Sequence, residues 1–321
     1  MGITCGLSVL YALVVWWIGT GLLLWLVRLH PRTYFLSVAG STAVLALALY
    51  GLAATSANMS ATGAYVAFTC AILVWAWPEM ALLTGWLTGP WRHPCPPHSR
   101  GWRRISCAIR AILYHEFALA GAGAAVLGLT WGAPNQVGSW TFAVLWVMRL
   151  SAKLNLFLGV RFFNDELLPD HLRYLKSFAA DRPINFLFMV SVTGATAAAT
   201  IIATQLWTSD GTAHPLTVIG CTLLVTLLVL AILEHWFLVL PFPVVMLWRW
   251  WLRLGPKQPG HANAEPPRFA LKVSASRSQA LALDSSGYAV ARGAWPLPSG
   301  ADLECEPPQE GLRKDLYGAS S

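Results

Sequence analysis

The sequence has few charged residues. Asp, Glu, Lys and Arg make up 12% of its 321 residues, about half the fraction typical of a soluble domain. None occurs from Leu7 to Val27 or from Ile184 to Trp207. Each of these runs is long enough to cross about 30 Å of hydrocarbon as a helix. Because a water-soluble helix needs a polar face, these runs exclude a soluble protein.

The sequence also lacks the short motifs of common enzyme classes. It has no HExxH, no Walker loop, no GxGxxG before a helix and no GxSxG. Its six cysteines form no CxxC pair, which argues against a zinc site or a disulfide scaffold. The net charge of +7 is mostly loop charge, so we expect no nucleic-acid partner. No Lys or Arg precedes the first apolar run, and no small-residue cleavage site follows it, so we expect it to be retained as a signal anchor.

Seven apolar segments are long enough to span a membrane. We therefore predict an all-α fold, a polytopic membrane helix bundle with seven transmembrane helices and membrane lipid around it. The segments cover residues 7–27, 34–55, 64–88, 106–130, 139–162, 184–207 and 216–240.

Basic residues alternate between the two sides of these segments. The first, third and fifth connections and the segment after the seventh span contain Lys or Arg, whereas the N-terminus and the other connections contain none. Because cytoplasmic loops carry the excess of Lys and Arg, we predict an N-out, C-in topology. Tryptophans such as Trp86, Trp131 and Trp207 lie near span ends, where indoles prefer the headgroup layer.

Two segments outside the spans have a predicted structure. In 163–183 we expect a short amphipathic helix after Pro169, with Leu172, Leu175 and Phe178 on one face. From Gly255 the composition shifts to Pro, Gly, Ala and Ser without an apolar period. We therefore divide the chain into a transmembrane domain, 1–254, and a flexible, disordered cytoplasmic tail, 255–321.

Several polar or ionisable residues fall inside the predicted spans. An ionisable side chain in hydrocarbon costs at least about 2.5 kcal/mol, so such residues usually pair or have a function. With the predicted topology, these residues all lie between the middle of the bilayer and its cytoplasmic surface. We therefore expect one polar cluster, formed by Glu79, His115, Glu116, Arg149, Lys153, Asn155, Glu234 and His235.

Three interpretations of this cluster are open. The first is a structural ion-pair cluster that holds helices in register, formed by Glu79, Arg149, Lys153 and Asn155 with Glu116 as a further partner. The second is a cofactor site, in which an imidazole binds a metal or the central ion of a tetrapyrrole; its residues are His115, His235, Glu116 and Glu234. The third is a catalytic metal or acid–base centre, whose catalytic residues the sequence does not specify.

Several segments resemble a known family. They are Asn155–Arg161 (NLFLGVR), Asn164–Phe178 (NDELLPDHLRYLKSF), Pro183–Asn185 with Ser191–Gly194, and Glu234–Leu238 (EHWFL). This block is similar to the photosynthetic complex assembly proteins of the PuhE type, which occur in anoxygenic phototrophic bacteria. The resemblance implies a role in assembling reaction-centre and light-harvesting complexes, or in modulating the supply of bacteriochlorophyll to them.

From the resemblance we expect a non-enzymatic membrane factor of photosynthesis. The implied partners are reaction-centre and light-harvesting apoproteins or pigment-synthesis proteins, and the implied cofactor is bacteriochlorophyll or a precursor. The implied location is the bacterial cytoplasmic (inner) membrane or the intracytoplasmic membrane, as a multi-pass protein. The alternative is an integral-membrane metalloenzyme of tetrapyrrole or lipid modification, with metal ligands among His115, Glu116, Glu166, His171, Glu234 and His235.

Overall fold

The computed structural model describes residues 2–96, 99, 101–161, 168–180, 184–208, 214–242 and 245–254. Met1–Asn263 forms one compact unit, which contains every helix named below. In the described ranges the chain forms helices and turns, and no β-strand. Glu166 and the predicted tail, 255–321, lie outside the described residues.

Among the described residues, seven helices are long and apolar enough to cross a membrane, so the predicted all-α fold with seven spans is confirmed. A membrane favours this solution because a helix satisfies its own backbone hydrogen bonds in hydrocarbon. The helices are α1 (Gly2–Val27), α2 (Tyr34–Thr55), α3 (Ala61–Leu83), α4 (Gly101–Thr130), α5 (Val137–Leu158), α6 (Phe186–Thr208) and α7 (Pro215–Phe237).

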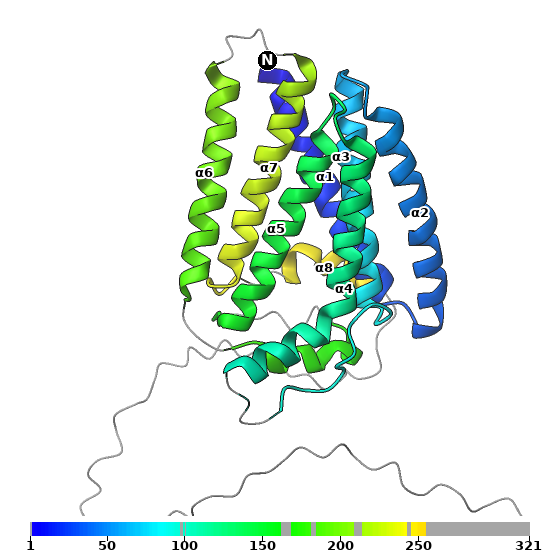
Figure 1. Ribbon diagram of the computed structural model, residues 1–321, viewed down its shortest axis with the longest axis vertical. Helices are drawn as coiled ribbons and strands as arrows, with labels where there is room; N and C mark the ends of the chain where they lie inside the picture. The colour runs from blue at the N-terminus through cyan, green and yellow to red at the C-terminus, as the bar shows by residue number, and fades with distance from the viewer. Residues whose placement is uncertain are drawn as a thin grey trace, which may run out of the picture. The chain divides into compact units, whose positions relative to one another are not determined.

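The centre of the bundle is formed by α3, α5 and α7, each of which packs against the other two. Helices α3 and α7 are the most buried of the seven spans. Helices α2 and α6 lie at opposite edges of the bundle (Figure 1). Fully buried apolar side chains such as Phe68, Leu119 and Leu223 fill the space between helices. Polar groups in the central helices therefore have protein around them rather than only lipid.

The connections gather at the two ends of the bundle as the sequence predicts. The Asn135 side chain donates hydrogen bonds to the carbonyls of Thr55, Asn58 and Gly63, so the second and fourth connections lie at one end. At the other end, the Cys95 amide donates to Ser177 Oγ at 2.7 Å, which joins the third and fifth connections. Both pairings agree with the alternation of basic residues along the chain.

The orientation of this bundle in the membrane is a prediction that reporter fusions test. A reporter active only in the periplasm is expected to be silent after Arg104 or Arg253 and active near Asn58 or Asn135, because basic connections stay in the cytoplasm. Enzymatic activity of each fusion, normalised to its level in the membrane, gives the answer. An active fusion at Arg104 would reverse the predicted orientation.

A loop of the third connection packs against α4 and forms backbone hydrogen bonds with it. The amides of both Tyr114 and His115 donate to the carbonyl of Thr88, and the Trp91 amide donates to the carbonyl of Arg110. At Gly89 an added Cβ would overlap the Arg110 carbonyl oxygen, so only glycine allows the two backbones to approach this closely. The first turns of α4 run obliquely below the bundle (Figure 1), and the transmembrane part follows this loop contact.

Two short elements complete the same end of the bundle. The helix predicted after Pro169 exists as the 3-10 helix η3 (Asp170–Phe178), with Leu172 and Phe178 buried. Helix α8 (Val245–Leu254) follows the last span and packs against α1. The Trp17 indole donates to the Leu247 carbonyl at 3.2 Å, and this bond fixes α8 beside the span.

Candidate functional site

The polar residues of α5 lie on two faces of that helix. Arg149 and Lys153 are four residues apart, as are Ser151 and Asn155, so each pair shares one face. The first pair contacts α3 and α4, whereas the second pair faces α6 and α7. The structure thus brings the predicted residues together around α5, but divides them between two sets of contacts.

An ion pair joins α3 to α5. Arg149 Nη2 lies 3.2 Å from Glu79 Oε2, and the Glu79 side chain is only 2% exposed. Glu79 follows Pro78, which lacks the amide hydrogen needed for the usual bond to the preceding turn. The structure therefore places a buried carboxylate directly after the proline of α3 and pairs it with a cation of α5. The second oxygen of Glu79 has no hydrogen-bond partner in the described part of the chain.

A second ion pair joins α5 to α4. Lys153 Nζ lies 2.7 Å from Glu116 Oε1 and 2.8 Å from His115 Nε2. Because an ammonium group only donates hydrogen bonds, Nε2 of His115 acts as the acceptor. The proton of the neutral ring is then on Nδ1, which lies 3.1 Å from the carbonyl of Pro78. Both nitrogens of this fully buried histidine are therefore engaged.

The other face of α5 forms a hydrogen-bonded network with α6 and α7. His235 Nδ1 donates to the carbonyl of Ala231 at 2.8 Å, and its Nε2 lies 3.0 Å from Ser151 Oγ. Ser151 in turn lies 2.6 Å from Ser191 of α6, and the Asn155 side chain donates to the Ser151 carbonyl. The side-chain amide of Asn185 donates to the backbone carbonyls of Asn155 and Gly159. These bonds satisfy two carbonyl groups at the C-terminal end of α5.

Glu234 and His235 point to different neighbours although they are adjacent in sequence. Glu234 accepts a hydrogen bond of 3.0 Å from the indole of Trp16 in α1. It also interacts electrostatically with Arg149. His235 is buried and faces α5, whereas Glu234 is exposed at the surface of the helix bundle. The two side chains of this dipeptide do not converge on a common point.

His171 lies away from the polar network around α5. It lies on η3, where its ring is 6.1 Å from the ring of Tyr34 and packs against Gly85. Partial burial lowers the pKa of His171 below its usual range, and the hydrogen bond to the Leu83 backbone and the charge of Asp170 act in the opposite direction. Gly85 has a φ of +81°, and this left-handed turn ends α3 earlier than the predicted span.

The residues proposed as ligands do not form a metal site in the described part of the chain. No group of three or more His, Cys, Asp or Glu side chains there is arranged to hold a metal ion. Glu166, the remaining member of the predicted ligand set, lies outside the described residues. Both nitrogens of His115 and of His235 have hydrogen-bond partners here, so ligation of a tetrapyrrole by either ring would require one of these bonds to open, and the cofactor site stays a prediction.

Sequence reasoning did not find several participants of these networks. Ser151 and Ser191 bridge α5 to α6, and Trp16 is the hydrogen-bond donor to Glu234. Serine and tryptophan are common in membrane helices, so composition gives no signal for these roles. Trp248 is 4% exposed, and its ring packs 5.5 Å from that of Trp16.

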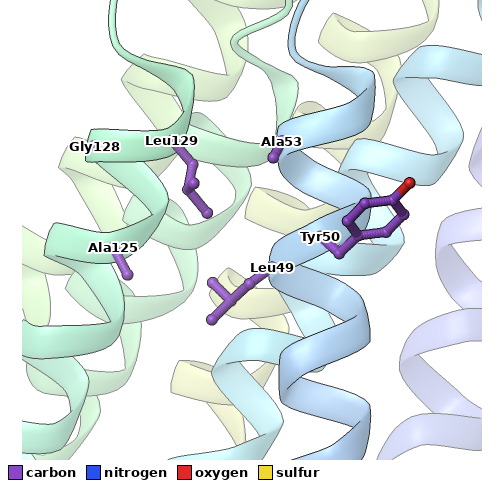
Figure 2. A pocket seen from close by; sticks show the side chains of 6 residues that line it. All are labelled: Leu49, Tyr50, Ala53, Ala125, Gly128 and Leu129. Atoms are coloured by element: carbon purple, nitrogen blue, oxygen red, sulfur yellow. The ribbon is translucent and has the colours of Figure 1, made fainter.

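One hollow in the described part of the chain lies between two helices and is lined mainly by apolar groups. It is a groove of about 490 Å³ between α2 and α4, and Figure 2 shows its lining residues. In a bilayer such a surface is covered by hydrocarbon. The candidate site is therefore the polar network around α5 and not this groove, which is lined by Leu49, Tyr50, Ala53, Ala125, Gly128 and Leu129.

Comparison with known proteins identifies a family model and a relative that are similar in sequence to this chain. Residues 3–259 match the family model described as "Protein of unknown function (DUF3623)". The chain is 39% identical over 267 residues to an uncharacterized 30.4 kDa protein in the puhA 5′ region of Rhodobacter capsulatus. The match covers 81% of this chain and 95% of that protein. No solved structure matches the chain significantly.

Proposed function

The chain belongs to the family of proteins of unknown function designated DUF3623, and we propose that it supports the assembly of bacterial photosynthetic complexes. The observation that carries this proposal is the relative whose gene lies in the puhA 5′ region, a photosynthesis locus. The similarity extends over 95% of that relative, and the family model matches residues 3–259 of this chain, the range in which the seven spans lie.

Within this role, we propose an assembly factor of the PuhE type for reaction-centre or light-harvesting complexes, or a protein that modulates their bacteriochlorophyll supply. The sequence block from Asn155 to Phe178 and the Glu234–Leu238 segment support this choice through their resemblance to that type. A multi-pass protein in the cytoplasmic or intracytoplasmic membrane would meet apoproteins or pigment-synthesis proteins where these insert into the bilayer.

The geometry favours a non-enzymatic role for the network around α5. Its charged groups pair with one another: Arg149 with Glu79, and Lys153 with Glu116. Such pairs position helices, because separating them leaves a charge without compensation in a medium of low polarity. Direct ligation of bacteriochlorophyll or a precursor by His115 or His235 would first require one of the present hydrogen bonds to break.

A deletion strain tests the proposed function. In a phototrophic host, loss of this chain is expected to lower the near-infrared absorption of reaction-centre and antenna complexes in the membranes, while respiratory growth stays normal. Complementation with the full chain should restore the absorption bands. Membranes of the deletion strain with unchanged photosynthetic complexes would refute the proposal.

A further inference from the structure

A continuous chain of hydrogen-bond contacts joins α7, α5 and α6 through His235. Nδ1 of His235 lies 2.8 Å from the carbonyl oxygen of Ala231, and Nε2 lies 3.0 Å from Ser151 Oγ. Ser151 Oγ lies 2.6 Å from Ser191 Oγ, which in turn lies 2.6 Å from the carbonyl oxygen of Leu187. The chain therefore consists of four contacts, and both of its ends are carbonyl oxygens.

The number of hydrogens available to these contacts depends on the charge of His235. Each contact needs one hydrogen, and a carbonyl oxygen supplies none. The two serine hydroxyls supply one each and a neutral imidazole supplies one, so a neutral ring leaves one contact without a hydrogen. A doubly protonated ring supplies two: Nδ1 donates to Ala231, and Nε2 donates to Ser151. Ser151 then donates to Ser191, and Ser191 donates to Leu187. All four contacts are satisfied only when the ring is doubly protonated.

A positive charge on His235 has a carboxylate beside it. Glu234, the preceding residue, interacts electrostatically with His235. Helices α1 and α6, which pack against α7, contain no Asp, Glu, Lys, Arg or His. The charged residues of the other two helices that pack against α7, α3 and α5, are Glu79, Arg149 and Lys153. These three form ion pairs on the other face of α5.

The hydrogen-bond chain reaches a helix with few neighbours. Helix α6 lies at the edge of the bundle and packs against α7 and α5 (Figure 1). The bond between Ser151 and Ser191 joins its side to α5, and Phe188 packs 5.4 Å from the ring of Trp236 on α7. The protonation of His235 therefore acts on the attachment of α6 to the centre of the bundle.

We propose that His235 is a proton-binding site whose proton, taken from the aqueous phase, completes the chain that holds α6 against α5 and α7. When the ring loses this proton, one contact of the chain opens. Because Ser191 belongs to α6, proton binding and the attachment of α6 favour each other equally. Histidine exchanges its proton between about pH 5 and 8, so the site responds to pH in this range. The proposal goes beyond the proposed function and does not depend on it.

Nitrogen NMR of the full chain tests the site directly. Protein with isotope-labelled histidine is placed in lipid nanodiscs and titrated between about pH 5 and 8. The signal of His235 is the one that is absent from His235→Gln and that shifts in Ser151→Ala. We expect hydrogen on both ring nitrogens at the acidic end, and the loss of one as the pH rises. A ring nitrogen of His235 that stays without hydrogen at every pH would overturn the proposal.

Ser191→Ala makes a prediction that a merely structural role does not make. It removes two contacts and one hydrogen, so that Ser151 and a neutral His235 satisfy the two contacts that remain. We expect the proton affinity of His235 to fall about tenfold or more, because the proton no longer closes an open hydrogen bond. Thr196→Ala is the matched control on α6, since the Thr196 hydroxyl donates to the Val192 carbonyl of its own helix. It should leave the titration unchanged. Equal proton affinity in Ser191→Ala and the natural protein would overturn the proposal.

Discussion

Replacing Glu79 with glutamine is expected to destabilise the protein strongly. The substitution leaves the guanidinium of Arg149 without its ion-pair partner, next to Lys153 on the same face of α5. Breaking a buried pair by removing one partner costs about 3–5 kcal/mol. Since the glutamine oxygen can still accept a hydrogen bond from Arg149, we expect a loss near the lower end of this range, about 3 kcal/mol. Unfolding of the purified protein, followed by tryptophan fluorescence in mild detergent, measures the effect.

Glu116→Gln is the matched control for this variant. Glu116 and Lys153 keep 25% and 18% of their side chains exposed, and Lys153 retains its contact with His115 after the change. We therefore expect a smaller loss than for Glu79→Gln, because the Lys153 ammonium group keeps a buried hydrogen-bond acceptor. If Glu79→Gln were as stable as Glu116→Gln, the burial of the Glu79 pair would have no energetic importance.

Gly89→Ala is expected to prevent normal accumulation of the protein in the membrane. A Cβ at this position would overlap the carbonyl oxygen of Arg110, and the next nearest atoms belong to the Ala111 backbone. Backbone atoms of a helix cannot rotate away as a side chain can, so the loop must separate from α4. The amides of Tyr114 and His115 then lose their shared acceptor, Thr88, at a cost of about 1–3 kcal/mol for each unsatisfied donor.

The control for Gly89→Ala is Gly121→Ala. Gly121 lies in the transmembrane part of α4, where an added Cβ meets nothing within 4 Å. In a helix, alanine is favoured over glycine by about 0.5–1 kcal/mol, so this variant should accumulate at least as well as the natural protein. Size-exclusion chromatography of fluorescently tagged variants compares the two levels. Equal peaks would mean that the loop does not pack against α4 as described.

The seven spans were predictable from the sequence because hydrocarbon imposes one simple rule. A segment that crosses the membrane must be apolar and helical for about 20 residues. The end of α3 was predicted five residues too late, since residues 84–88 carry no charge that would mark the end of a span. Their turn depends on the left-handed conformation of Gly85, which hydropathy does not reveal.

The sequence was sufficient to predict which polar residues of the candidate site lie inside the spans. It was not sufficient to predict which of them contact one another. Charges inside apolar runs identified Glu79, Arg149 and Lys153 as residues that need partners. Which carboxylate meets which cation depends on the contacts of α3, α4 and α5, and a single sequence contains no such distances. The separation of Glu234 from His235 shows the same limit, because neighbouring residues on a helix point about 100° apart.

Helix α8 was missed for a different reason. Its ten residues combine tryptophans with Arg249 and Arg253, a composition that we interpreted only as the boundary after the last span. The segment is too short for its apolar period to stand out from the preceding helix. Its position became apparent only from contacts with α1, through Trp17 and through the packing of Trp248 on Trp16.

The interpretation of the inner half of the bundle depends on the pairing of Glu79 with Arg149. A double-mutant cycle with Glu79→Gln, Arg149→Gln and the double variant measures this pairing as a coupling free energy. We predict that each single change is destabilising, and that the double variant regains stability relative to Glu79→Gln because no unpaired charge remains. The predicted coupling is at least about 1.5 kcal/mol. Additive effects, with a coupling near zero, would contradict the ion pair as the element that joins α3 to α5.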